Sequence, residues 1–154
     1  MTGLSILLLA PAVLQGILIL VDEGWFHRRR GLPRWERIGH PLDTLTAAAC
    51  IGWLAVHRPG GEALAVYAGL AFFSSVFVTK DSFVHSSLCS AGENMAHSIL
   101  YVLHPIVFLG FGLLWLSGRD LWAVRVQLAL TIAYAAYQFV FWNLVWDPKS
   151  LSGG

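Results

Sequence analysis

Five long apolar blocks constrain this chain more than any other feature of its sequence. They cover about residues 3–26, 41–56, 62–79, 95–116 and 121–146, with short polar or Gly/Pro-containing segments between them. A helix needs about 20 apolar residues to cross the hydrocarbon core of a bilayer. Only 12% of the residues are charged, well below the roughly 25% typical of soluble domains. The sequence therefore predicts an all-α integral membrane protein with five transmembrane helices.

The segments between the blocks carry their positive charge unequally. Counted on alternate sides, seven Lys and Arg residues (Arg28, Arg29, Arg30, Arg34, Arg37, Lys80 and Lys149) stand against three (Arg58, Arg119 and Arg125). Because cytoplasmic loops are enriched in Lys and Arg, the first side is predicted to be cytoplasmic, with the amino terminus outside. We expect one helical-bundle domain over 1–149 in a bacterial cytoplasmic membrane, and a mobile tail over 150–154. The net charge of +1 indicates no nucleic-acid partner.

Acids and histidines recur at one spacing near the predicted cytoplasmic ends of the helices. Each of four histidines follows an acid by four residues, and the pairs are Glu23 and His27, Glu36 and His40, Asp81 and His85, and Glu93 and His97. Residues four apart share a face of a helix, so each pair can direct two ligand atoms to one point. His57, on the opposite side, has Trp53 at the corresponding position.

The four pairs form two copies of one unit. The first pair recurs 58 residues later and the second pair recurs 57 residues later. Each copy contains a helix that ends in an acid–His pair, a polar loop, and a second such pair that opens the next helix. This pattern predicts a tandem internal repeat. The first and second transmembrane helices would correspond to the third and fourth, with the fifth packed alongside.

The residue types in these pairs are typical of a transition-metal site. Imidazole and carboxylate together suit iron, manganese, zinc or copper, whereas calcium and magnesium prefer oxygen ligands alone. Eight such side chains exceed what one ion can use, so we predict two metal ions, with iron favoured and zinc, copper or haem as alternatives. Five more residues are predicted as extra ligands or as support for the ligands: Asp22, Asp43, His104, Gln138 and Asn143. The alternative interpretation is solvated helix ends with weak ion pairs.

One stretch resembles a known family. Residues 79–85 read Thr-Lys-Asp-Ser-Phe-Val-His, and His97, Tyr101 and Pro105 follow in the next apolar block. This resembles the metal-binding stretch of the C subunit of the membrane methane and ammonia monooxygenases, which has Asp-x3-His-x12-His before an apolar helix with Tyr and Pro. Here eleven residues separate the two histidines. The resemblance implies that Asp81, His85 and His97 bind one metal.

Three functions are compatible with this pattern. The first, which we favour, is a di-iron oxidase, hydroxylase or desaturase that acts on an apolar or lipid substrate. It would need a separate electron donor, because the sequence has no flavin or iron–sulfur motif. The second is a zinc-dependent hydrolase of a lipid amide or ester, with a spare acid such as Glu93 or Asp43 as general base. The third is a non-enzymatic haem- or metal-binding membrane protein.

Overall fold

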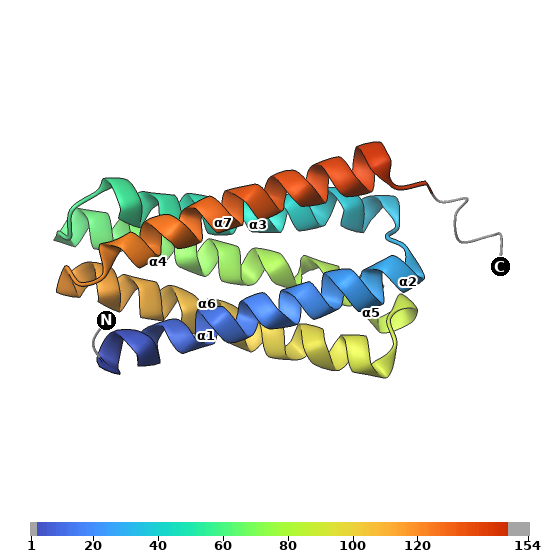
Figure 1. Cartoon of the computed structure of the whole chain (residues 1–154), viewed down its shortest axis with the longest axis horizontal. Helices are drawn as coiled ribbons and strands as arrows, with labels where there is room; N and C mark the ends of the chain where they lie inside the picture. Colours follow the sequence, from blue (N-terminus) through green and yellow to red (C-terminus); the bar gives the residue numbers. More distant parts are fainter. Residues whose placement is uncertain (1–2, 148–154) are drawn as a thin grey trace.

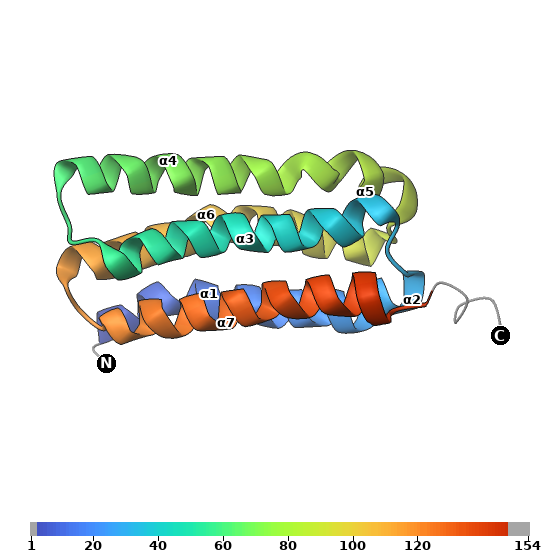
Figure 2. The same cartoon turned by 90° about the horizontal axis from the view of Figure 1, so that it is seen from above.

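The chain folds into a bundle of long helices. A computed structural model describes residues 3–147, apart from the side chains at 83, 84 and 86. This part of the chain is almost entirely helical and contains no strand, which confirms the all-α prediction. The predicted tail at 150–154 lies outside the described residues. The helices run along one long axis, and α1 begins at the end of the bundle opposite to the end where α7 finishes (Figures 1 and 2).

The described residues form five helical units, three of which contain a short segment that is not α-helical. In chain order, the segments are α1 (Gly3–Val21), the π-helical η1 (Asp22–His27), α2 (Arg28–Arg30), α3 (Arg34–Val56), α4 (Gly61–Phe77), the 3-10 turn η2 (Val78–Asp81), α5 (Ser82–Leu88), α6 (Ala91–Ser117), α7 (Leu121–Val140) and the π-helical η3 (Phe141–Val145). These boundaries follow the five predicted spans closely.

Local chemistry explains where the helices begin and end. Gly31 and Gly118 end α2 and α6 with φ angles of 74° and 66°, a conformation that only glycine adopts at little cost. Pro33 precedes α3, where its fixed φ favours helix initiation. The Ser90 hydroxyl accepts a hydrogen bond from the backbone N–H of Glu93 and caps α6.

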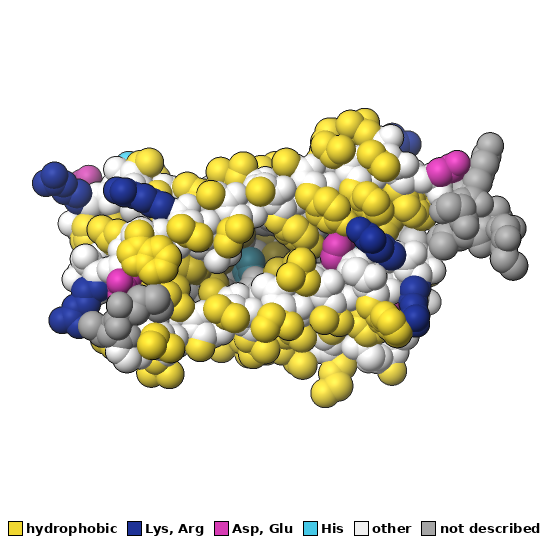
Figure 3. Space-filling model, viewed as in Figure 1, with side chains coloured by type: hydrophobic (Ala, Val, Ile, Leu, Met, Phe, Trp, Pro, Cys, Tyr) yellow, Lys and Arg dark blue, Asp and Glu magenta, His cyan; other side chains and the backbone are white. Residues whose placement is uncertain are grey.

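Four of the helical units in the described range are long and apolar enough to cross a membrane. They are Gly3–Arg30, Gly61–Asp81, Ala91–Ser117 and Leu121–Val145. The fifth, α3, has 23 residues but begins with a polar stretch, and it packs against α4, α6 and α7. Large apolar side chains cover much of the face shown in Figure 3. These features are compatible with a membrane protein.

The helices pack in pairs that hold the bundle together. α3 lies against α7 and α4, and α1 lies against α6. The apolar core includes Cys50, Leu54, Phe111 and Trp115, all almost fully buried. In the predicted tandem repeat, α1 on α6 and α4 on α3 would be equivalent pairs. The superposition of the two halves stays a prediction.

Gly110 is the closest point between α1 and α6. A Cβ atom at this position would overlap the backbone oxygen of Leu8. Small residues at helix interfaces allow such close approach in membranes. We expect Gly110→Ala to destabilise the protein by about 1–3 kcal/mol, because the clash is with backbone that cannot move independently. Thermal unfolding in detergent measures this. Gly69→Ala, where a Cβ meets nothing within 4 Å, should be neutral, and equal effects at both positions would contradict the prediction.

Candidate metal centre

The predicted acids and histidines gather at one end of the bundle, the end where α2 and α5 lie (Figure 1). Most of them are buried: Asp22, Glu23, His27, Glu36, Asp81, His85, Glu93 and His97, while His40 is partly buried. Burial of so many ionisable groups is costly unless each group is paired or bound to a cation. The contacts inside this cluster therefore decide what it can do.

The π-helical segment η1 brings two acids to one histidine. The wider π turn brings residues five apart close together, so His27 contacts both Asp22 and Glu23. His27 Nε2 lies 3.1 Å from Asp22 Oδ2, and His27 Nδ1 lies 3.3 Å from Glu23 Oε2. The α-helical spacing assumed from the sequence left Asp22 among the extra ligands or supporting residues and did not predict its contact with His27.

The Glu23 carboxylate is held by neutral donors from the last helix. Trp142 Nε1 donates at 2.6 Å, and the hydroxyls of Tyr137 and Tyr134 donate at 3.1 and 3.4 Å. These donors fix the position of the Glu23 carboxylate, which can also accept a hydrogen bond from Nδ1–H of His27. A carboxylate in this position fixes the tautomer of a histidine and directs its other nitrogen toward a metal.

The Nε2 atom of His27 then carries a lone pair directed at carboxylates. It has no hydrogen-bond partner among the described residues, and Asp22 Oδ2 and Glu93 Oε1 lie 3.1 and 4.0 Å away. A lone pair facing carboxylate oxygens is repulsive unless a cation, either a proton or a metal ion, lies between them. His85 Nε2 and His97 Nδ1 are two more buried ring nitrogens that find no hydrogen-bond partner within the described part of the chain.

The ligand atoms fall into two main groups, each with its atoms within 4.8 Å of one another. The first group comprises Asp22, His27, Glu93 and His97, and the second comprises His40, Asp81 and His85. Two ring contacts join the groups: the His85 and His97 ring centroids are 4.0 Å apart, and those of His27 and His40 are 4.8 Å apart. Buried His, Asp and Glu clusters of this kind can hold a metal ion.

The contacts occur in matched pairs that the predicted repeat relates. His27 to Glu93 in one half corresponds to His85 to Glu36 in the other, at 4.0 and 3.4 Å. The two ring contacts just described also correspond to each other. One difference between the halves reverses a charge, because the first copy has Asp22 where the second has Lys80.

Two basic side chains neutralise part of the negative charge. Arg30 pairs with Glu36 at 2.8 Å and with Glu93 at 3.0 Å. It therefore links two acids that occupy equivalent positions in the two copies of the predicted repeat. Lys80 pairs with Asp43 at 2.7 Å and with Asp81 at 2.8 Å. From the sequence, Arg28-Arg29-Arg30 was interpreted mainly as a topology signal and its pairs with Glu36 as weak ion pairs, and the contact of Arg30 with Glu93 was not predicted.

The charges in the cluster do not balance. Six carboxylates lie in it, those of Asp22, Glu23, Glu36, Asp43, Asp81 and Glu93. Among the described residues, only Arg30 and Lys80 pair with them as permanent cations. With all six carboxyls ionised, the excess would be four negative charges, which two divalent ions or four protonated imidazoles would match. Uncompensated buried charge at this scale is too costly to persist.

Two side chains outside the apolar spans, Glu36 and Cys89, have pKa values that their surroundings shift strongly. Burial raises the pKa of the Glu36 carboxyl, but contacts with His85 and Arg30 outweigh it and lower that pKa to about 2. Burial raises the pKa of the Cys89 thiol to about 12. The Cys89 sulfur lies near ligand atoms of His85 and His97, but a thiol with this pKa keeps its proton at neutral pH.

The five residues predicted to support the site take different places. Asp22 lies inside the first group and Asp43 beside Lys80. Gln138 accepts from the Thr44 hydroxyl at 2.7 Å. Asn143 donates to the backbone oxygens of Arg37 and Phe139 rather than to the acids and histidines of the cluster. His104, the fifth, lies deeper in the bundle, with Gln15 and Ser74.

A cavity of about 700 Å³ leads away from the cluster into the bundle. Its lining runs from Asp22 and His40 to Leu9 and Trp122, and most of it is apolar. Thirteen residues of helix separate Leu9 from Asp22, which corresponds to about 20 Å. The cavity lies between α1 and α7, which share little contact because α1 packs on α6 and α7 on α3. Figure 3 shows a hollow on this face, with a histidine at its bottom.

Comparisons of this chain with protein-family models, curated proteins and solved structures find no match.

Proposed function

We propose that this chain is an integral-membrane metalloprotein that holds two metal ions, with iron favoured over other metals. It would oxidise an apolar or lipid substrate. The observation that carries the proposal is the excess of four buried negative charges around three imidazole nitrogens that have no hydrogen-bond partner. A transition-metal ion satisfies both needs, because it supplies positive charge and accepts imidazole lone pairs.

The two groups of ligand atoms would form the two half-sites. Asp22, His27, Glu93 and His97 would hold one ion, and His40, Asp81 and His85 the other, with Glu36 next to His85. Mixed nitrogen and oxygen ligands suit iron, which supplies oxygen activation when bound. Glu23, predicted from sequence as a direct ligand, would instead orient His27 through its Nδ1–H.

The rest of the chain would provide the surroundings for this chemistry. The apolar cavity would bring a hydrocarbon substrate to the cluster and keep water away from it. Arg30 would hold Glu36 and Glu93 in place. Electrons would come from a separate donor protein. The arginine distribution supports a cytoplasmic position for the cluster and an external amino terminus.

The distances between the paired histidine rings do not fit a haem bound between them. Two axial histidines must stand on opposite faces of a flat macrocycle. The His85 and His97 rings are stacked with centroids 4.0 Å apart, and the His27 and His40 centroids are 4.8 Å apart. These separations leave no room for a porphyrin between either pair.

Elemental analysis and an absorption spectrum of the protein purified in detergent test the proposal. We expect two iron ions per chain, since two half-sites and four uncompensated charges are present. One zinc without iron would favour the lipid hydrolase instead, and a Soret band would select a haem protein. A chain free of metal after purification from metal-replete cells would contradict the proposal and identify the cluster as a network of protonated histidines and carboxylates.

A further inference from the structure

Cys89 lies at the edge of the cluster, in the short link between α5 and α6. It directly follows the last residue of α5 and is only partly buried, and its neighbours Leu88 and Ser90 are exposed. Two ligand side chains behind it are almost closed to solvent, since His85 is 5% exposed and His97 is 6% exposed. An ion that arrives from this end of the bundle therefore meets the Cys89 sulfur before the imidazoles.

Helical geometry brings this sulfur to the two imidazoles. Cys89 follows His85 by four residues, and its backbone N–H donates to the His85 carbonyl at 3.0 Å, so the two side chains share one face of the helix. The His97 ring, from α6, stacks on the His85 ring with centroids 4.0 Å apart. The sulfur and one ligand nitrogen of each ring lie within 4.8 Å of one another. Three ligand atoms thus meet at one place.

Each of the two imidazoles has a nitrogen that needs a partner. His97 Nε2 lies 2.9 Å from Asp22 Oδ2, whereas its Nδ1 is buried and has no hydrogen-bond partner among the described residues. For His85 the nitrogen in this state is Nε2, while Nδ1 lies 3.3 Å from the Tyr101 hydroxyl. A buried polar atom without a partner is unfavourable, and a metal ion bound to the ring nitrogen removes that cost.

Two imidazoles and one thiolate form a ligand set that suits copper better than iron. Soft thiolate ligands favour copper(I), and copper electron-transfer sites use two histidines and a cysteine. The two half-sites described above offer only nitrogen and oxygen ligands. The Cys89 thiol keeps its proton until a metal displaces it. Binding forms a copper–sulfur bond, breaks the S–H bond and releases the proton to solvent, and the copper stays copper(I).

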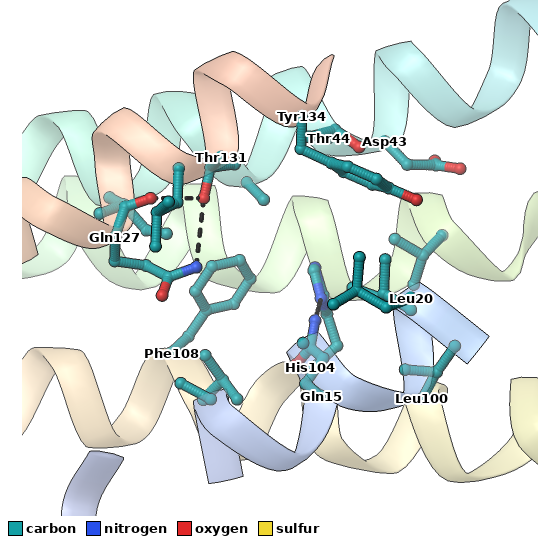
Figure 4. A pocket seen from close by; sticks show the side chains of 18 of the residues that line it. Gln15, Leu20, Asp43, Thr44, Leu100, His104, Phe108, Gln127, Thr131 and Tyr134 are labelled. Carbon is teal, nitrogen blue, oxygen red and sulfur yellow. Dashed lines mark hydrogen bonds between the residues drawn. The ribbon is translucent and has the colours of Figure 1, made fainter. Parts of the chain in front are cut away.

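The cavity gives a poorer route for a copper ion. His85 and His97 line it, and Cys89 does not. Its wall, drawn in part in Figure 4, is mostly apolar and includes Leu20 and Leu100. A hydrated ion on such a wall loses water and gains few ligands. Copper would therefore reach the two imidazoles from the Cys89 side.

We propose that His85, Cys89 and His97 form a separate site for copper(I), reached from the end of the bundle where α5 lies. His97 belongs to one proposed half-site and His85 to the other. A copper ion bound to both imidazoles takes one ligand from each half-site, so it excludes the pair of iron ions. The exclusion rests on the proposed function, whereas the copper site itself does not.

Titration of the purified full-length protein with copper(I), in detergent and without oxygen, tests the site. Ultraviolet charge-transfer absorption reports the copper–thiolate bond, and elemental analysis after desalting counts both metals. We expect one copper ion per chain with this absorption, together with release of the iron. Cys89→Ser should remove the absorption and weaken copper binding by more than about 10-fold, because losing a ligand costs at least as much as losing a residue that supports one.

The one other cysteine of the chain supplies a matched control. Cys50 is fully buried in the apolar core, so Cys50→Ala should bind copper with the same absorption as the unaltered protein. Cys89→Ser should keep the iron content of the unaltered protein, because Cys89 belongs to neither half-site, and this result would show that the variant folds. Copper should not displace that iron.

Histidine variants separate the three-ligand site from a thiol that binds copper by itself. His85→Ala and His97→Ala should each weaken copper binding, and His57→Ala should not. Equal copper affinity in all three, or copper bound by Cys89→Ser as tightly as by the unaltered chain, would overturn the inference. Iron retained in full beside the copper would overturn the exclusion. Copper–thiolate absorption in a chain that holds no iron would leave the site standing while the proposed function fails, and iron without that absorption would do the reverse.

Discussion

Replacing His27 or His97 with Ala is expected to weaken metal binding by more than about 100-fold, because each imidazole belongs to the half-site that also contains Asp22 and Glu93. His97 Nε2 lies 2.9 Å from Asp22 Oδ2, which ties the His97 ring to this group, and water replaces an imidazole ligand poorly. His40→Ala and His85→Ala should each lower bound metal as well. Elemental analysis of each purified variant measures the effect.

His57→Ala is the matched control. This histidine lies at the opposite end of the chain's first helical hairpin, where it stacks on Trp53 and is exposed. Its loss should leave metal content unchanged. If His57→Ala depletes metal as much as His97→Ala, or if all four cluster variants keep full metal, the two-metal proposal is wrong.

Glu23→Gln should weaken metal binding by about 10- to 100-fold without removing a direct ligand. The amide is neutral and also carries its own N–H donors, so it no longer favours the tautomer in which His27 Nδ1 carries the proton. The Trp142 and Tyr137 donors would still surround the side chain, and the fold should persist. Metal titration of the apoprotein, followed by competition with a chelator, gives the affinity.

Glu62→Gln serves as the control for the change in charge. Glu62 is an exposed acid in the first turn of α4, away from the cluster, so this variant should bind metal like the unaltered protein. A Glu23→Gln protein with unchanged affinity would show that Glu23 does not orient His27. Complete loss of metal would instead place Glu23 among the direct ligands, as the sequence predicted.

Much of the fold follows from sequence because membrane helices are specified by long apolar runs. The second apolar block, at about 41–56, lies within α3, which begins at Arg34. The acid–His spacing also identifies the side chains that meet at one end of the bundle, since it depends only on helical periodicity.

The rest depends on features that periodicity does not encode. The π turn at Asp22–His27 brings Asp22 into the site. The acid–His spacing used for prediction does not indicate this turn. The ion pairs of Arg30 with Glu36 and Glu93 depend on how three helix ends meet. Gln138, predicted to support the ligands, lines the cavity and accepts a hydrogen bond from Thr44 of the neighbouring α3.

The gap between α1 and α7 has a consequence for how activity would be measured. A substrate that reaches the cluster through this gap never passes through water, so its aqueous concentration does not govern the rate. Saturation would follow the mole fraction of substrate in the bilayer. Added membrane lipid would then slow turnover by dilution, and detergent chains of similar length would compete for the same space.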